Sequence, residues 1–159
     1  MAGIFELAKP SDLLQKLNRE LERLRRSPGD ADHAFNFFVT AEHLLDWIYP
    51  GSSGKSQREA LRNGDPLLEL ISHIASGAKH FDKLSTHHRS MSGSKSVSGY
   101  FSRDYWPRGW FGRGYFSEES IEISVTGPAA KALGSSTVTA LDLAQHVLAY
   151  WSAPGRIPN

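Results

Sequence analysis

The spacing of hydrophobic residues predicts four helices in the first half of the chain. Leucines three and four residues apart give residues 11–27 the pattern of an amphipathic helix, and Ser11 is its expected N-cap. These leucines are Leu14, Leu17, Leu21 and Leu24. A wider apolar arc over residues 30–49 predicts the most buried helix of the domain. Two further helices are expected over residues 55–63 and 66–85.

The second half of the chain has a pattern that predicts a loop, strands and one more helix. Residues 86–96 are rich in Ser, Gly, His and Lys, and we expect them to form a mobile loop. Strands are expected within residues 97–125, where the phrase IEISV alternates apolar and polar residues. The final helix should cover about residues 139–152, with Thr139 as N-cap and Asp142 completing a capping box.

Together these elements predict a single domain over residues 1–159 with an α+β, mostly helical fold. The expected architecture is an antiparallel helical bundle with a small aromatic-rich β-hairpin or meander insert and a C-terminal closing helix. A chain of 159 residues is long enough to bury one substantial core and short for two.

Composition narrows the possible functions. The formal net charge is +1, so no global field draws the chain to nucleic acid or to an anionic membrane. The absence of cysteine excludes disulfides, thiol nucleophiles and thiolate metal sites. No stretch approaches the roughly 20 apolar residues that cross a bilayer. The first residues also lack the pattern of a signal peptide. We therefore expect a cytoplasmic protein that does not interact with a membrane.

Three histidines recur at seven-residue intervals: His73, His80 and His87. On a continuous helix they would share one face, because seven residues rotate through nearly two turns. Each step also separates the Cα atoms by roughly 10.5 Å along the axis, and two imidazoles cannot easily converge across that gap on one metal at about 2.1 Å. The spacing therefore argues against a shared metal, and we expect neither a metal nor a cofactor.

The chain has no evident catalytic motif, and an enzyme hypothesis must rest on histidines. Residues 51–56, GSSGKS, end in Lys-Ser but lack the full spacing of a phosphate-binding P-loop. Helical nucleases of the HEPN class use an Arg and a His about four to six residues apart on one helix, for charge stabilisation and acid–base catalysis. No Arg precedes His73, His80 or His87 at that distance. The alternative function is therefore an RNase-like toxin or defence enzyme that uses His43 and His80, provided that both rings share a cleft.

Residues 100–116 combine aromatic side chains with arginines. Eight of these seventeen residues are aromatic, and three arginines are interleaved with them. Three interpretations are open: a hairpin packed on the helices, a protein interface enriched in Tyr, Trp and Arg, and a stacking surface for single-stranded nucleic acid. The candidate binding residues are Arg103, Tyr105, Trp106, Arg108, Trp110 and Arg113.

Two phrases, AFNFFVTAEHLLDW at residues 34–47 and DPLLELISHIASGAKHF at residues 65–81, carry a family resemblance. They resemble a family of small, largely uncharacterised bacterial helical proteins with phrases of the form A-x-N-x-x-V-T-A-x-H-L-x-D-W and I-A-N-G-x-K-H-F. The resemblance covers roughly residues 30–84 and implies a helical fold, with Ser76 in place of the usual Asn. The candidate catalytic residues that it indicates are Asn36, His43, Asp46, Lys79 and His80.

The sequence as a whole favours a small cytoplasmic interaction or accessory protein. Its expected partner is another protein, bound through the aromatic and arginine residues of the segment 100–116. A nucleic acid is the alternative partner for that segment. The leucine seam from Leu14 to Leu24 could face a second copy of the chain, which would make a homo-oligomer.

Overall fold

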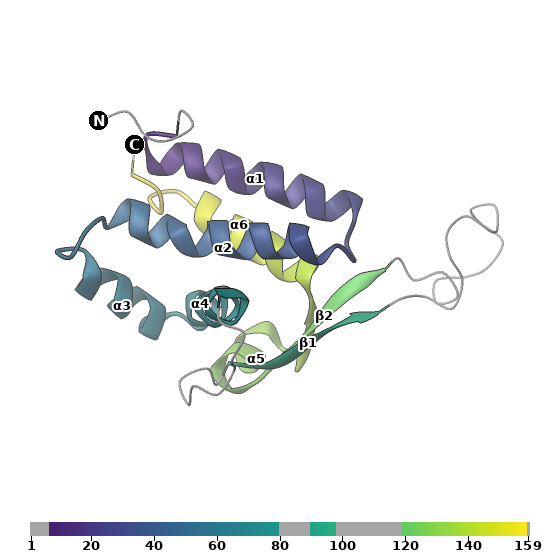
Figure 1. Cartoon of the computed structure of the whole chain (residues 1–159). Helices are drawn as coiled ribbons and strands as arrows, with labels where there is room; N and C mark the ends of the chain where they lie inside the picture. The colour runs from purple at the N-terminus through teal and green to yellow at the C-terminus, as the bar shows by residue number, and fades with distance from the viewer. Residues whose placement is uncertain (1–6, 80–89, 98–118, 159) are drawn as a thin grey trace.

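Helices dominate the fold, and a small sheet lies beside them (Figure 1). The computed structural model describes residues 7–79, 90–97 and 119–158. The elements of these residues, in chain order, are α1 (Pro10–Arg26), α2 (Ala31–Ile48), α3 (Lys55–Gly64), α4 (Pro66–Lys79), β1 (Met91–Val97), β2 (Ser120–Val125), α5 (Gly127–Leu133), β3 (Thr137–Thr139) and α6 (Ala140–Ser152). The described residues therefore have the predicted α+β, mostly helical character.

Most predicted helix boundaries agree with the structure to within one residue. The helices predicted over residues 11–27, 30–49 and 55–63 are α1, α2 and α3. The last predicted helix is α6, which begins directly after its N-cap Thr139. For the helix predicted over residues 66–85, the structure describes α4 as far as Lys79, so its remainder lies outside the described residues.

The predicted N-cap of the first helix is wrong. Lys9, not Ser11, caps α1, and Pro10 occupies the first helical position, where its fixed φ and missing N–H cost nothing. The carboxylate of Asp12 accepts hydrogen bonds from the backbone N–H of Ala8 at 2.9 Å and of Lys9 at 3.1 Å. An acidic side chain two residues after the proline thus takes the capping role that the sequence assigns to a serine hydroxyl.

The apolar arc of α2 is enclosed by three other helices. This helix contacts α1, α4 and α6, and the rings of Phe37 and Phe38 pack edge to face with their centroids 5.3 Å apart. Phe37, Phe38, Leu44 and Leu45 are almost completely buried. Asp30 caps the helix by accepting from the N–H groups of Asp32 and His33. The expectation of a deeply buried second helix is therefore confirmed.

The leucine seam of α1 faces the core of its own chain. Leu17, Leu21 and Leu24 are at most 1% exposed, and α1 packs against both α2 and α6. Leu14 is partly buried against the same core. These contacts within one chain already cover the surface through which the sequence suggests a homo-oligomer.

The sheet corrects the prediction of a mobile loop for residues 91–96, while residues 86–89 of that predicted loop lie outside the described residues. Residues 91–97 form the edge strand β1, which pairs antiparallel with the central strand β2, and β2 pairs antiparallel with β3. The composition of β1, MSGSKSV, is typical of a loop, so its pairing is dictated by β2, whose Ile121, Ile123 and Val125 are buried. Of the strands expected within residues 97–125, β2 is present, and residues 98–118 lie outside the described residues. The pattern also misses α5 and β3, which have seven and three residues and so span too few periods.

Glu20 of α1 has a buried carboxylate. It is 3% exposed, and its Oε1 accepts from Lys16 Nζ at 2.9 Å and from Arg23 Nη1 at 2.8 Å. Lys16 Nζ also donates to Thr40 Oγ1 of α2 at 2.9 Å, which links the two helices. Burial raises the pKa of Glu20, but the hydrogen bonds and charges of Lys16 and Arg23 outweigh it, so the pKa is lowered from its usual 4.5.

We expect Glu20→Gln to destabilise the protein at neutral pH by about 1–3 kcal/mol, because the charge-assisted hydrogen bonds are lost. A lowered pKa in the folded state stabilises the fold above the unfolded value of 4.5, and this stabilisation disappears as the pH falls through the folded value. The difference between wild type and variant in urea unfolding should therefore shrink below pH 4.5. A difference that stays constant from pH 7 to pH 3 would contradict this account.

Candidate functional site

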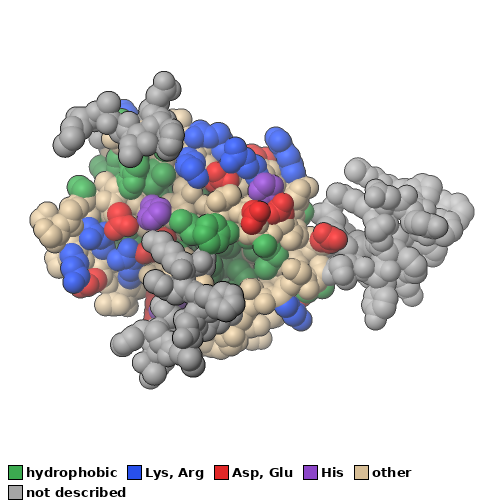
Figure 2. Space-filling model, in the orientation of Figure 1, with side chains coloured by type: hydrophobic (Ala, Val, Ile, Leu, Met, Phe, Trp, Pro, Cys, Tyr) green, Lys and Arg blue, Asp and Glu red, His purple; other side chains and the backbone are tan. Residues whose placement is uncertain are grey.

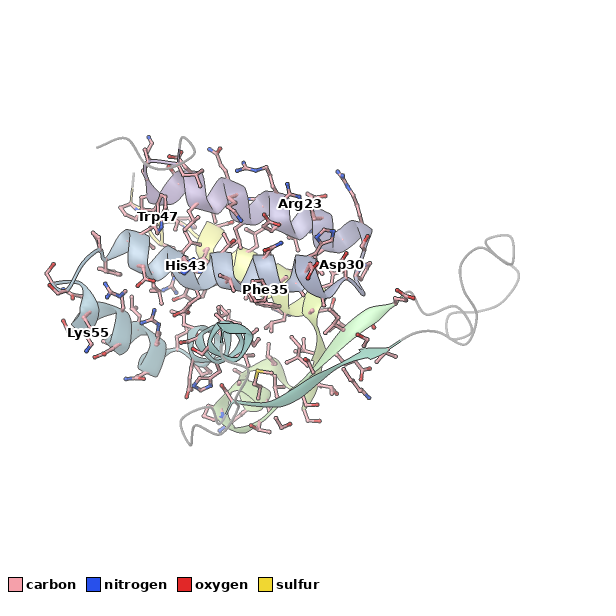
Figure 3. All side chains as sticks on the ribbon, viewed as in Figure 1. Arg23, Asp30, Phe35, His43, Trp47 and Lys55 are labelled. Atoms are coloured by element: carbon pink, nitrogen blue, oxygen red, sulfur yellow. The ribbon has the colours of Figure 1, made fainter. Side chains whose placement is uncertain are left out.

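Three of the five candidate catalytic residues have described side chains, and all three lie on α2. Asn36 is exposed on the first half of the helix. His43 and Asp46 follow on the second half and are half-buried, and Figure 3 labels His43. Sequence reasoning thus places Asn36, His43 and Asp46 correctly on one helix.

The side chains of the remaining candidates lie outside the described part of the structure. Lys79 is the last residue of α4 whose backbone is described. His80 and all six candidate binding residues of the segment 100–116 lie outside the described residues. The meeting of His43 with His80, on which the RNase-like hypothesis depends, therefore stays a prediction.

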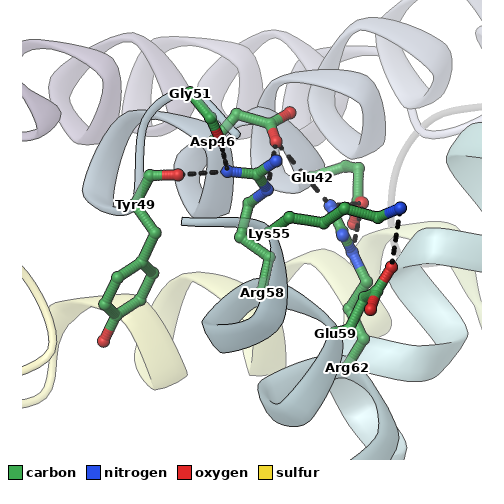
Figure 4. A network of polar contacts seen from close by, with 8 residues as sticks. All are labelled: Glu42, Asp46, Tyr49, Gly51, Lys55, Arg58, Glu59 and Arg62. Atoms are coloured by element: carbon green, nitrogen blue, oxygen red, sulfur yellow. Dashed lines mark hydrogen bonds and ion pairs between the residues drawn. The ribbon is translucent and has the colours of Figure 1, made fainter. Parts of the chain in front are cut away.

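Asp46 belongs to a cluster of ion pairs that joins α2 to α3, here called the α2–α3 network (Figure 4). Its Oδ1 lies 3.0 Å from Arg58 Nε and 4.0 Å from Arg62 Nη2. Glu42, one turn earlier, accepts through Oε1 from Arg62 Nε at 2.8 Å, with Arg62 Nη2 at 2.5 Å. Figure 2 shows acidic and basic side chains side by side in this part of the surface. The charges of the network compensate one another.

Arg58 also organises the turn between the two helices. Its Nη1 donates to the backbone carbonyls of Tyr49 and of Gly51, the latter at 3.0 Å (Figure 4). The turn is tight at Gly54, because a Cβ built there would lie 2.2 Å from the carbonyl oxygen of Tyr49. The Arg58 side chain, which is only 15% exposed, thus satisfies carbonyls at the end of α2 while it holds Asp46.

Glu42 lies at the junction of α2, α3 and α4. Burial raises its pKa above the usual 4.5 by more than Arg62 and a hydrogen bond from Ser72 of α4 lower it, and the charge of Asp46 adds to the rise. A carboxyl group with a raised pKa is a chemical candidate for an acid or base. Here, however, the side chain is only 12% exposed and its oxygen is held by Arg62, so the arrangement serves above all to hold helices together.

The network matters because α3 has no buried residue of its own. Leu61 packs partly against the core, and the other strong attachments of the helix to α2 are Arg58 and Arg62. From the sequence, Asp46 is predicted only as a candidate catalytic residue, without its contacts to Arg58 and Arg62. The signal was present: two acids four residues apart on one helix face two arginines four residues apart on the next, which suits antiparallel neighbours.

His73, the first residue of the histidine repeat, bonds to a serine. Its Nδ1 and the Oγ of Ser90 form a hydrogen bond that joins α4 to the residue preceding β1. A serine beside an imidazole is the pairing of nucleophilic catalysis. Ser90 is only 1% exposed, and its carbonyl accepts from the N–H of Thr126 at 2.9 Å, so the pair anchors the sheet to α4 rather than facing a substrate.

No group of three or more His, Asp or Glu side chains in the described part of the chain could hold a metal ion. None of the described helices combines the length and the apolar character that crossing a membrane requires.

Comparisons of the chain with protein-family models, curated proteins and solved structures find no match. The family resemblance of residues 30–84 therefore stays a prediction.

We expect Glu42→Gln to stabilise the protein at pH 7 by about 1 kcal/mol, because Gln keeps the hydrogen bonds without the cost of a buried charge. The raised pKa of Glu42 means that its ionisation costs stability above the folded value, and this cost vanishes below the unfolded value of 4.5. The gain in urea unfolding should therefore disappear near pH 4. Glu42→Ala is the matched variant, and it should destabilise by about 1–3 kcal/mol because Arg62 and Ser72 lose a partner. A destabilising Glu42→Gln would contradict the argument.

Gly54→Ala should destabilise the protein by about 1–3 kcal/mol, because the new methyl group collides with backbone at Tyr49. The backbone of Gly54 has a φ of −82°, which alanine adopts readily, so the cost is steric alone. Gly64→Ala is the control, since a Cβ there has nothing within 4 Å. Thermal unfolding of both variants checks the prediction, and equal melting temperatures would refute it.

Proposed function

We propose that this chain is an interaction protein that presents the segment between β1 and β2, residues 98–119, to a protein partner. The observation that carries the proposal is the register of the two strands, in which Val97 pairs with Ser120. The two ends of a segment rich in aromatics and arginines are therefore held next to each other on one ribbon (Figure 1). Fixing the ends reduces the chain entropy that binding would cost.

The ribbon is attached firmly to the helices. Ile121 and Ile123 of β2 are buried in the core, and β2 contacts α6. On the other face of the ribbon, Lys95 of β1 and Glu122 of β2 form an ion pair at 3.0 Å. The ends of the segment thus start from a fixed position, which is the property expected of a scaffold that carries a binding loop.

The composition of the segment supports a protein as the partner. Tyr, Trp and Arg dominate the energetics of protein interfaces, because they bury large areas with few rotatable bonds or form several hydrogen bonds at once. Trp110 and Arg108 are the proposed anchors, flanked by Tyr105 and Arg113. The described polar clusters, in contrast, are committed to holding helices and strands together, as Glu42 with Arg62 and His73 with Ser90 show.

The test is capture of a partner by the tagged full-length chain, followed by purification of that partner and titration. Trp110→Ala and Arg108→Ala should each weaken binding by about tenfold or more, since hot-spot residues contribute about 2 kcal/mol or more. Circular dichroism should show an unchanged fold for both variants.

Matched controls come from described, exposed residues elsewhere. Phe35→Ala removes an aromatic side chain that is 45% exposed on α2, and Lys131→Ala removes an exposed cation on α5. Both controls should bind like the wild type. Equal capture by Trp110→Ala, Arg108→Ala and the wild type would refute the proposal.

A further inference from the structure

We infer that the solvent-facing side of α1 is a binding surface for the phosphate backbone of a nucleic acid. The surface consists of Arg19, Arg23 and Arg26, here called the α1 basic stripe; Lys16 is not part of it, because its Nζ is held by Glu20 and by Thr40 of α2. This inference goes beyond the proposed function, because it concerns another part of the molecule and does not rest on the segment between β1 and β2.

The α1 basic stripe is a straight row of positive charges. Its members are four and three residues apart, so they share one face of the helix and extend over about 10.5 Å. The opposite face carries the buried Leu17, Leu21 and Leu24, which turns the stripe toward solvent. Basic side chains gather over α1 in Figure 2, and Figure 3 labels Arg23.

Most of the charge in the stripe is not compensated. Lys16 and Arg23 share one carboxylate, Glu20, at 2.9 Å and 2.8 Å. Arg19 and Arg26 are exposed, and within the described residues neither has a carboxylate partner. The stripe thus holds a strong local positive charge although the whole chain has a formal charge of only +1.

Stabilisation of the helix does not account for the whole stripe. Basic residues in the last turn favour a helix by interacting with its dipole, and this applies to Arg23 and Arg26. It does not apply to Arg19, which lies in the middle of α1. Arg25, also in the last turn, pairs with Glu22 at 2.5 Å, which shows that this helix can neutralise its arginines where the sequence supplies an acid.

A nucleic acid fits the stripe better than other anionic surfaces. Its phosphates form a regular linear array of charge, which matches a straight row of cations. All three cations are arginines, whose planar fork binds phosphate oxygens through two hydrogen bonds. A helix that binds a membrane surface inserts its apolar face into the lipid, whereas the apolar face of α1 is buried in the core.

The test titrates the whole chain into a labelled single-stranded RNA of about 20 nucleotides or a labelled DNA duplex of about 20 base pairs. The fluorescence anisotropy of the nucleic acid is measured between about 50 and 200 mM salt. The logarithm of the association constant should fall linearly with that of the salt concentration. Arg19→Gln combined with Arg26→Gln should weaken binding by about tenfold or more at low salt and reduce the slope by about 1.5 to 2. These residues make no ion pair, so circular dichroism should be unchanged.

The control is Lys55→Gln combined with Lys131→Gln, which removes the same charge from exposed positions on α3 and α5. This double variant should keep both the affinity and the slope. The inference is overturned if the wild type binds neither probe, or if the control weakens binding as much as the α1 variant. It is also overturned if loss of Arg19 and Arg26 affects binding to anionic phospholipid vesicles but not to nucleic acid. Capture of a protein partner by the α1 variant should persist, so failure here is distinguishable from failure of the proposed function.

Discussion

The apolar arc of α2 is the constraint on which the rest of the described structure depends. A helix with Phe37, Phe38, Leu44 and Leu45 on its surface is stable in water only if other elements cover it on several sides. α1, α4 and α6 provide that cover, and α6 in turn supports β2. This arrangement explains why the leucine seam of α1 packs against helices of its own chain. It also explains why the sheet is held against the helices through α6.

The borders of α2 show how the same residue type can have opposite effects on stability. Glu20 of α1 is buried and Glu42 of α2 is half-buried, and each pairs with an arginine. The pKa of Glu20 is lowered because Lys16 and Arg23 together outweigh its burial, whereas burial prevails over Arg62 and Ser72 at Glu42. A buried carboxylate stabilises a fold only when its partners repay the cost of desolvation, so its sign depends on the donors that surround it.

Helical periodicity allowed most of the helices to be predicted, because each long helix repeats its apolar pattern over several turns. The errors fall where a neighbour determines the outcome. The sequence predicts Ser11 as the N-cap of α1, but Asp12 accepts the capping hydrogen bonds. The strand β1 has the composition of a loop, but it pairs with the strongly patterned β2. The α2–α3 network was missed because charges on separate helices are informative only when the helices are read as an antiparallel pair.

The position of the candidate residues on one helix could be predicted from the sequence, but their chemical role could not. Asn36, His43 and Asp46 do share α2, yet Asp46 is occupied by Arg58, which also satisfies the carbonyls of the turn. The ion pair of Asp46 therefore has a structural use, because it helps to hold α3, which otherwise packs through Leu61 and against α4. A surface whose charged or aromatic groups make no structural contact does not lose such contacts when it binds a partner. Arg19 and Arg26 are described examples of such groups, and this difference in structural contacts is the physical reason to place function at the edges of the fold rather than in its buried polar contacts.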